Sequence, residues 1–195
     1  MGDGKWLSRG IRRKQGGKRR GSAKDRGNAP AGNARGRLAF ESLEDRRVLA
    51  TYLVNNFGDL DEDDNVILGT LRWALDAANA TEDRDQIVFS EDALVAQGGG
   101  ATIGLNGGVL TITQPIDILG PGARRVEVAQ GRPNQRVFDL NIGADDEIFG
   151  SQISGLTISG GNVVGDDAKG GGVYNREALL MLEVVIEGNS AQSGG

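Results

Sequence analysis

The residues with the clearest potential for chemistry are the carboxylates of the stretch DLDEDDN at 59–65. Asp59, Asp61 and Asp63 stand at alternate positions, which is how a D-x-D-x-D calcium loop begins. The sixth position of that loop is Asp64 rather than Gly and the twelfth is Thr70 rather than Glu, so an EF-hand is excluded. The three aspartates remain a candidate for a looser Ca²⁺ site, against the simpler interpretation of a solvated acidic loop.

Further carboxylates at 145–147 and 166–167 lie in expected loops between strands, where a glycan-cleaving enzyme would carry its acid, base or calcium ligands. Only Lys169 and Arg176 offer a matching positive charge nearby. The chain has no His and no Cys, which excludes Ser-His-Asp, Cys-His and His-metal catalysis. We therefore expect a protein that is not an enzyme and has no cofactor, with a polysaccharide lyase or hydrolase as the alternative.

The charge is divided between two parts of the chain. Residues 1–50 carry 14 Lys/Arg against 5 Asp/Glu, whereas the remaining 145 residues carry 8 against 22. An acidic body is a poor partner for nucleic acid, and the basic leader at 1–37 has only Trp6 for stacking bases. We expect a leader or anchor role for this segment and no binding of nucleic acid.

The elements that must position any site begin after residue 50. Residues 1–37 are rich in Gly, Arg and Lys and poor in apolar side chains, which predicts a disordered basic leader. No apolar run is long enough for a cleavable secretory signal or a transmembrane segment. The segment 38–50 contains FESLEDRRVLA, whose spacing fits a short amphipathic helix.

An N-terminal cap is expected over 51–100, built around a helix at 69–80. Leu71, Ala74, Leu75 and Ala78 follow the i, i+3, i+4, i+7 spacing of one apolar face, with Thr70 as N-cap. Arg72 lies off this face and is expected to be exposed.

Short strands of Val, Ile, Leu and Thr, bounded by Gly, Asn, Pro or Asp, fill the region 101–195. LTISGGN at 156–162 reappears 28 residues later as VVIEGNS at 184–190. A period of this length is typical of stacked coils, and no long helix intervenes. The sequence predicts an all-β protein, a right-handed parallel β-helix. Asparagines beside the strand ends are candidates for an internal ladder: Asn106, Asn141, Asn162, Asn175 and Asn189.

Two resemblances extend this prediction. The segment 40–49 is similar to the LEPR-XLL sorting motif that follows a basic leader in large exported planctomycete proteins, with Asp45 where that motif has Pro. The body resembles the CSLREAI-type, polymorphic-outer-membrane-protein-like β-helix proteins in the order of its phrases, which are GTLRWAL (69–75), DQIVF (85–89), VLTITQPIDILGPGA (109–123), RVF (136–138), ISGLTISGGN (153–162), GGGVYN (170–175) and IEGNSA (186–191).

The resemblance implies a parallel β-helix whose N-terminal end is covered by the 69–80 helix. It also implies an extracellular or cell-surface, outer-membrane-associated protein with a structural, adhesive or glycan-contacting role. Its partners would be envelope components or extracellular glycans and proteins. Because about four coils are visible and no polar cap follows them, we also expect an incomplete solenoid that associates end to end.

Overall fold

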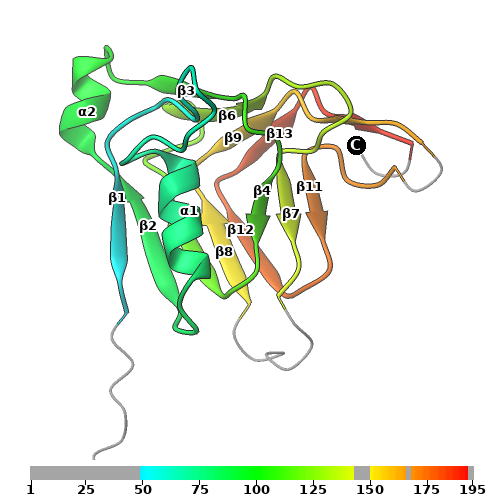
Figure 1. Cartoon of the computed structure of the whole chain (residues 1–195), viewed down its shortest axis with the longest axis horizontal. Helices are drawn as coiled ribbons and strands as arrows, with labels where there is room; N and C mark the ends of the chain where they lie inside the picture. The colour runs from blue at the N-terminus through cyan, green and yellow to red at the C-terminus, as the bar shows by residue number, and fades with distance from the viewer. Residues whose placement is uncertain (1–48, 143–149, 166–167, 193–195) are drawn as a thin grey trace, which may run out of the picture. The chain divides into compact units, whose positions relative to one another are not determined.

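The computed structural model describes residues 49–142, 150–165 and 168–192. The basic leader, nearly all of the sorting-motif-like segment, and the carboxylates at 145–147 and 166–167 lie outside these residues, so the expectations for them stay predictions. The body is a β-solenoid of about three turns, in which every strand pair is parallel (Figure 1). The predicted parallel β-helix is confirmed.

Three sheets form the sides of the coils. The five-stranded sheet has the order β1 (Thr51–Val54), β2 (Asp85–Phe89), β5 (Ile116–Leu119), β8 (Ser151–Ser154), β12 (Leu179–Leu182). The four-stranded sheet has the order β13 (Val185–Glu187), β9 (Thr157–Ser159), β6 (Val126–Gln130), β3 (Ala101–Leu105). The three-stranded sheet has the order β11 (Val173–Asn175), β7 (Phe138–Leu140), β4 (Leu110–Ile112), and a further pair joins β10 (Asn162–Val163) to β14 (Ser190–Ala191).

The predicted repeat matches the register of the two C-terminal coils. Thr157 pairs with Val185 and Asn162 with Ser190, both 28 residues apart, as the two similar phrases require. The asparagine ladder is not formed where the structure describes its members. Asn162 lies opposite Ser190, and Asn175 lies opposite Leu140.

Two apolar runs, ISGLTISGG at 153–161 and ALLMLEVVIEG at 178–188, each contain two strands rather than one. The run ISGLTISGG is divided at Gly155, which has a φ of +60°. A Cβ at this position would overlap the backbone of Gly120 in the preceding coil. The run ALLMLEVVIEG is divided at Glu183, which has a φ of +53°. These positive φ values turn the chain from the five-stranded sheet into the four-stranded sheet, so each coil has a corner there.

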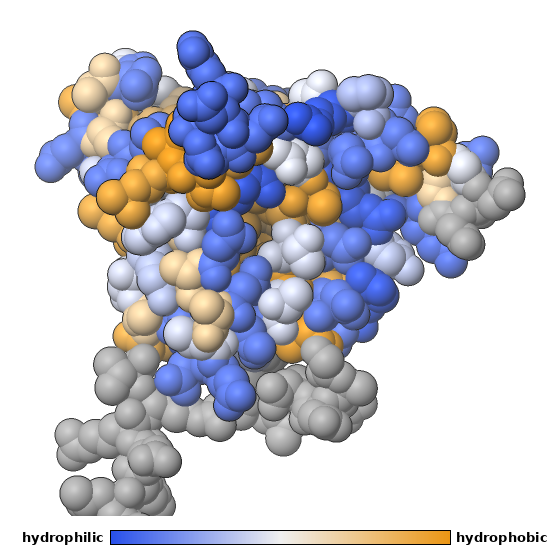
Figure 2. Space-filling model, viewed as in Figure 1, coloured by the Kyte–Doolittle hydropathy of each residue, from blue (hydrophilic) through white to orange (hydrophobic). Residues whose placement is uncertain are grey.

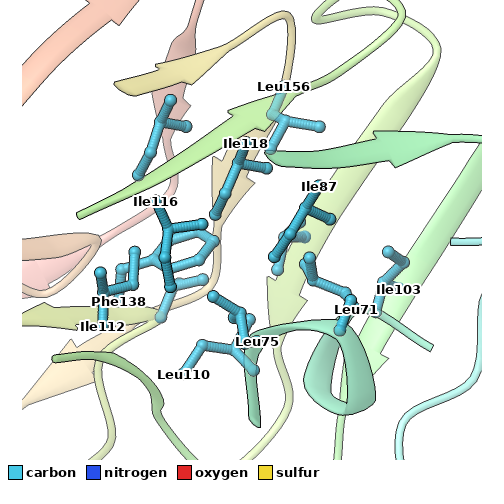
Figure 3. Packing of buried hydrophobic residues seen from close by; sticks show 14 of the residues in the cluster. Leu71, Leu75, Ile87, Ile103, Leu110, Ile112, Ile116, Ile118, Phe138 and Leu156 are labelled. Carbon is cyan, nitrogen blue, oxygen red and sulfur yellow. The ribbon is translucent and has the colours of Figure 1, made fainter. Parts of the chain in front are cut away.

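The core is a stack of side chains that point inward from alternate strand positions (Figure 3). Ile87, Ile118 and Ile153 lie in register on one wall, and Ile103, Val128 and Ile158 on another. All six are fully buried. A buried side chain of this size stabilises the fold by roughly 1.5–3 kcal/mol, so the stack is the main source of stability.

Helix α1 (Leu71–Asn79) covers the N-terminal end of this core, as predicted, and lies between β2 and β4 (Figure 1). Its residues Leu71, Ala74, Leu75 and Ala78 are buried, and it packs against β1, β2 and β4. The Thr70 hydroxyl caps the helix by accepting a hydrogen bond from the Trp73 N–H at 3.2 Å. A second helix, α2 (Glu91–Ala96), was not predicted. It begins at the N-cap Ser90, whose hydroxyl accepts from the Ala93 N–H at 3.3 Å.

In the described part of the chain, no helix is long and apolar enough to cross a membrane. The face that bears α1 is covered largely by hydrophilic side chains, with apolar patches between them (Figure 2). The exposed apolar side chains include Leu180 and Leu182 of β12 and Ile186 of β13, each about half exposed.

Candidate functional site

A groove lies on the outer face of the four-stranded sheet. It has a volume of about 620 Å³. Its lining contains few large side chains and several polar or charged ones, namely Gly100, Ala101, Thr102, Ala123, Arg124, Arg125, Glu127, Thr157, Val185 and Glu187. We call this the outer groove.

Strand alternation explains which side chains reach the outer groove. Val126, Val128 and Gln130 of β6 are buried, so the intervening Glu127 points outward. The parallel register then places Thr102, Glu127 and Thr157 in one outward row across β3, β6 and β9. Val185 continues this row on β13, and Glu187 lies two residues further along that strand.

The Glu127 carboxylate accepts hydrogen bonds from the two neighbouring strands of the groove. Its Oε1 accepts from the Ser159 hydroxyl at 2.6 Å, and its Oε2 accepts from the Thr102 hydroxyl at 3.3 Å. The Thr157 hydroxyl donates to the Ala123 carbonyl. The carboxylate is therefore held in place by the strands on both sides of it, with acceptor capacity left for a ligand.

One edge of the groove is fixed by Arg125. Its Nε donates to the Gly99 carbonyl at 3.0 Å, and its Nη1 and Nη2 donate to the two carboxylate oxygens of Glu91 at 2.8 and 2.7 Å. This bidentate pair lowers the pKa of Glu91 and raises the pKa of Arg125, chiefly through the hydrogen bonds between them. Arg125 thus links helix α2 to the groove, and its Nε, Nη1 and Nη2 are all engaged in these hydrogen bonds.

The neighbouring Arg124 and the carboxylate of Glu187 have no partner within the described residues, and both are exposed. The groove therefore presents one free cation, two carboxylates, the exposed Thr102 and the largely buried Thr157 around the small apolar surface of Ala101, Ala123 and Val185. Such a mixture suits a ligand that is rich in hydroxyl groups and has no strong net charge.

The predicted calcium residues are not brought together. Asp59 is buried, and its carboxylate pairs with Arg72, with Nε to Oδ1 at 2.6 Å and Nη2 to Oδ2 at 3.1 Å. Asp61 accepts instead from the backbone N–H groups of Asp63 and Asn65 at 2.9 and 2.8 Å, and these bonds, above all those from Asn65, lower its pKa. Asp63 is exposed.

Among the residues that the structure describes, no group of three or more acidic side chains is placed to hold a metal ion. The oxygens of Asp59 are also taken by the N–H groups of Asn106 and Gly107, at 2.9 and 2.7 Å. Asp59 therefore has a structural role, and the alternate spacing of Asp59, Asp61 and Asp63 does not place their carboxylates around a common metal site.

The expectation that Arg72 is exposed is wrong. Its side chain is only 12% exposed, because it extends from α1 into the turn that follows β3. There Nη2 donates to the Gly108 carbonyl at 2.8 Å and Nη1 to the Val109 carbonyl at 3.1 Å. Helical periodicity identifies the apolar face but does not show that a loop folds over the opposite flank.

The outer groove was also missed from the sequence. Thr102 and Glu127 lie 25 residues apart, and Glu127 and Thr157 lie 30 residues apart, so the row matches no fixed spacing. The only signal available in advance was that each is a polar residue between two apolar ones in a strand. Comparison of the chain with protein-family models, curated proteins and solved structures gives no match.

Proposed function

We propose that the chain is an exported or cell-surface β-helix protein whose outer groove binds a neutral glycan without cleaving it. The observation that carries the proposal is the row of Thr102, Glu127 and Thr157 across three adjacent strands of the groove. The row offers carboxylate and hydroxyl groups at the spacing of successive coils, about 4.8 Å. A sugar chain presents hydroxyl groups in a comparable repeating manner.

The proposal of export rests on the resemblance of residues 40–49 to a sorting motif, together with the acidic body that follows it. It is independent of the groove and has its own test. Fractionation of the producing cells, followed by protease treatment of intact cells, should place the protein in the surface or extracellular fraction. Recovery in the cytoplasm alone would contradict export.

The enzyme alternative is a glycan hydrolase or lyase in the same groove, and it rests on Glu127 and Glu187. One strand, β9, separates them and Glu187 lies two residues further along, so their backbones lie on the order of 12 Å apart before the side chains extend. Inverting glycosidases hold their two carboxyl groups roughly 6.5–9.5 Å apart. The hydroxyl donors on Glu127 leave it suited to accepting hydrogen bonds from a ligand, which favours binding over proton donation.

Titration calorimetry with neutral hexasaccharides, such as xylohexaose and chitohexaose, tests the groove. We expect Glu127→Gln to weaken the affinity for the bound sugar by about tenfold or more, since a hydrogen bond to a charged group contributes about 1.5–3 kcal/mol. Glu82→Gln is the matched control, because Glu82 is exposed and lies outside the groove. Equal affinities of the two variants would contradict the proposal.

Catalysis is tested in the same samples. Incubation with polygalacturonate or alginate, with absorbance of unsaturated products as the readout, detects a lyase, and reducing-end release from the hexasaccharides detects a hydrolase. We expect no turnover above a protein-free blank. Turnover that Glu127→Gln abolishes would favour the enzyme alternative.

A further inference from the structure

A second cluster of charged side chains lies on the three-stranded sheet, away from the outer groove. Asp139 of β7 and Tyr174 of β11 are directly opposite each other in the parallel register. Arg136 lies two residues before β7, and Arg176 follows β11 directly. The fold therefore brings two arginines, one tyrosine and one aspartate from two adjacent coils to one place. Hydrophilic side chains gather over β7 and β11 in this view (Figure 2).

The Tyr174 ring contacts the guanidinium groups of both arginines. The guanidinium carbon of Arg136 is 4.5 Å from the centre of the Tyr174 ring, and that of Arg176 is 5.0 Å from it. Both distances are within the range of a cation–π contact, so one ring anchors two guanidinium groups. The two guanidinium carbons cannot be further apart than the sum of these distances.

Asp139 balances only one of the two charges. Its Oδ1 accepts from Arg176 Nη2 at 2.7 Å, and its Oδ2 accepts from Arg136 Nη1 at 3.3 Å. A guanidinium has five N–H donors, and each arginine uses one of them here. Within the described part of the chain, Asp139 is the only acceptor that contacts either guanidinium, so the cluster keeps a net positive charge and several unused donors.

The cluster is partly enclosed but still reachable from solvent. The side chains of Arg136 and Asp139 are 18% and 23% exposed, and that of Arg176 is 42% exposed. The ring and the carboxylate fix the directions of the guanidinium groups before any ligand arrives, which lowers the entropy cost of binding. Two like charges this close repel each other, and an additional anion would relieve that repulsion.

We propose that Arg136, Tyr174 and Arg176 bind an oxyanion of an acidic polysaccharide, either the carboxylate of a uronic acid or a sulfate ester. Guanidinium groups match both anions through paired N–H donors. The surrounding body gives no general attraction for polyanions, because residues 51–195 carry 8 Lys/Arg against 22 Asp/Glu. Binding there would depend on the local geometry of the cluster. This site lies outside the outer groove, and its proposal does not depend on the groove binding sugar.

The test uses the full chain and three immobilised polymers: polygalacturonate, which carries carboxylates, dextran sulfate, which carries sulfates, and neutral dextran. We expect binding to one of the anionic polymers at low ionic strength, and a weaker interaction at high salt because the charges are screened. We expect Arg176→Gln and Arg136→Gln each to lower that affinity by about tenfold or more. The preferred polymer identifies the source of the oxyanion.

Arg132→Gln is the matched control. It makes the same change of charge at an exposed arginine whose guanidinium has no partner among the described residues. The basic arm of residues 1–50 is identical in all variants, so any binding through it appears as a common background. Equal affinities of Arg132→Gln, Arg136→Gln and Arg176→Gln would overturn the proposal, as would the absence of binding to both anionic polymers.

Arg176→Lys separates guanidinium recognition from simple charge. It keeps the positive charge but loses the planar pair of donors, so we expect it to bind several-fold more weakly than the unmodified chain. Unchanged affinity of Arg176→Lys would contradict the proposed site. Far-ultraviolet circular dichroism confirms that each variant is folded. If Arg136→Gln does not fold, the more exposed Arg176 carries the test alone.

Discussion

Arg72 and Asp59 form an ion pair with 2.6 Å between Nε and Oδ1, and the aspartate side chain is 1% exposed. The pair joins α1 to the acidic loop at 59–65. The pair also joins α1 and the acidic loop to the turn after β3. In that turn, Asn106 and Gly107 donate to Asp59, and Gly108 accepts from Arg72. The pair therefore fastens the helical cap to the first complete coil.

Arg72→Met should be strongly destabilising. It leaves the carboxylate of Asp59 buried beside two backbone donors with no cation, and breaking a buried pair in this way costs about 3–5 kcal/mol. Urea unfolding followed by circular dichroism measures the change. Arg132→Met, at an exposed arginine, should change the free energy of unfolding by less than about 0.5 kcal/mol.

The double variant Asp59→Asn/Arg72→Met distinguishes the ion pair from simple packing. Because it removes the orphaned charge, it should be more stable than Arg72→Met alone. A double variant less stable than Arg72→Met would contradict the role that we assign to the pair.

Leu71→Ala should lower the free energy of unfolding by about 2–5 kcal/mol, because Leu71 is fully buried between α1 and the core and the change leaves a cavity. Leu68→Ala is the matched control three residues earlier, at a side chain that is 72% exposed. Denaturant unfolding of both variants under the same conditions makes the comparison. Similar losses for the two substitutions would show that α1 does not cover the core.

Asp76 on α1 should make stability depend on pH. Asp76 is an exposed residue, but partial desolvation on α1 raises its pKa above the ordinary value of 3.8, with Arg72 opposing the rise and Asp59 adding to it. Because the folded pKa is raised, the stabilising contribution is complete below pH 3.8 and is lost as the pH rises through the folded pKa.

Asp76→Asn removes this dependence, so the variant should unfold at a slightly higher temperature than the unmodified chain at neutral pH, the effect being small because Asp76 is exposed. The difference should vanish in acid, where Asp76 is protonated. Thermal unfolding across a series of buffers measures it. Glu62→Gln, at an exposed carboxylate, is the control. A neutral-pH stabilisation that persists unchanged in acid would argue against titration of Asp76 as the cause.

The apolar side chains of β12 and β13 should promote self-association. Leu182 and Ile186 are each 46% exposed beside strand edges that have no further partner among the described residues. Such edges pair readily with other chains. Light scattering at low micromolar concentration should give a mass above the 20.5 kDa of one chain, and Leu182→Lys/Ile186→Lys should lower it. A monodisperse 20.5 kDa species would contradict the prediction.

The fold could be predicted from the sequence because its signals are local or recur along the chain. Thr70 and the apolar face beginning at Leu71 specify the capping helix, and the similar segments at 156–162 and 184–190 give the 28-residue spacing of the last two coils. The corner at Glu183 was missed because an L-residue with positive φ leaves no clear mark in an apolar run.

The functional surfaces could not be predicted in the same way, because they depend on register between coils of unequal length. Asp139 and Tyr174 are 35 residues apart, yet Leu110 and Phe138 in the same sheet are only 28 apart. Arg72 was misjudged because its partner, Asp59, looked like part of a solvated acidic loop. Each of these contacts is visible only once the coils are stacked.

The most direct test of the proposed glycan groove is a map of backbone amide chemical-shift changes as the preferred neutral hexasaccharide is added to the isotope-labelled chain. The largest changes should cluster on β3, β6, β9 and β13 around Thr102, Glu127 and Thr157, with β4, β7 and β11 unaffected. Glu127→Gln should strongly reduce them at the same sugar concentration. Changes confined to another sheet, or a pattern that Glu127→Gln leaves intact, would contradict the assignment of the outer groove.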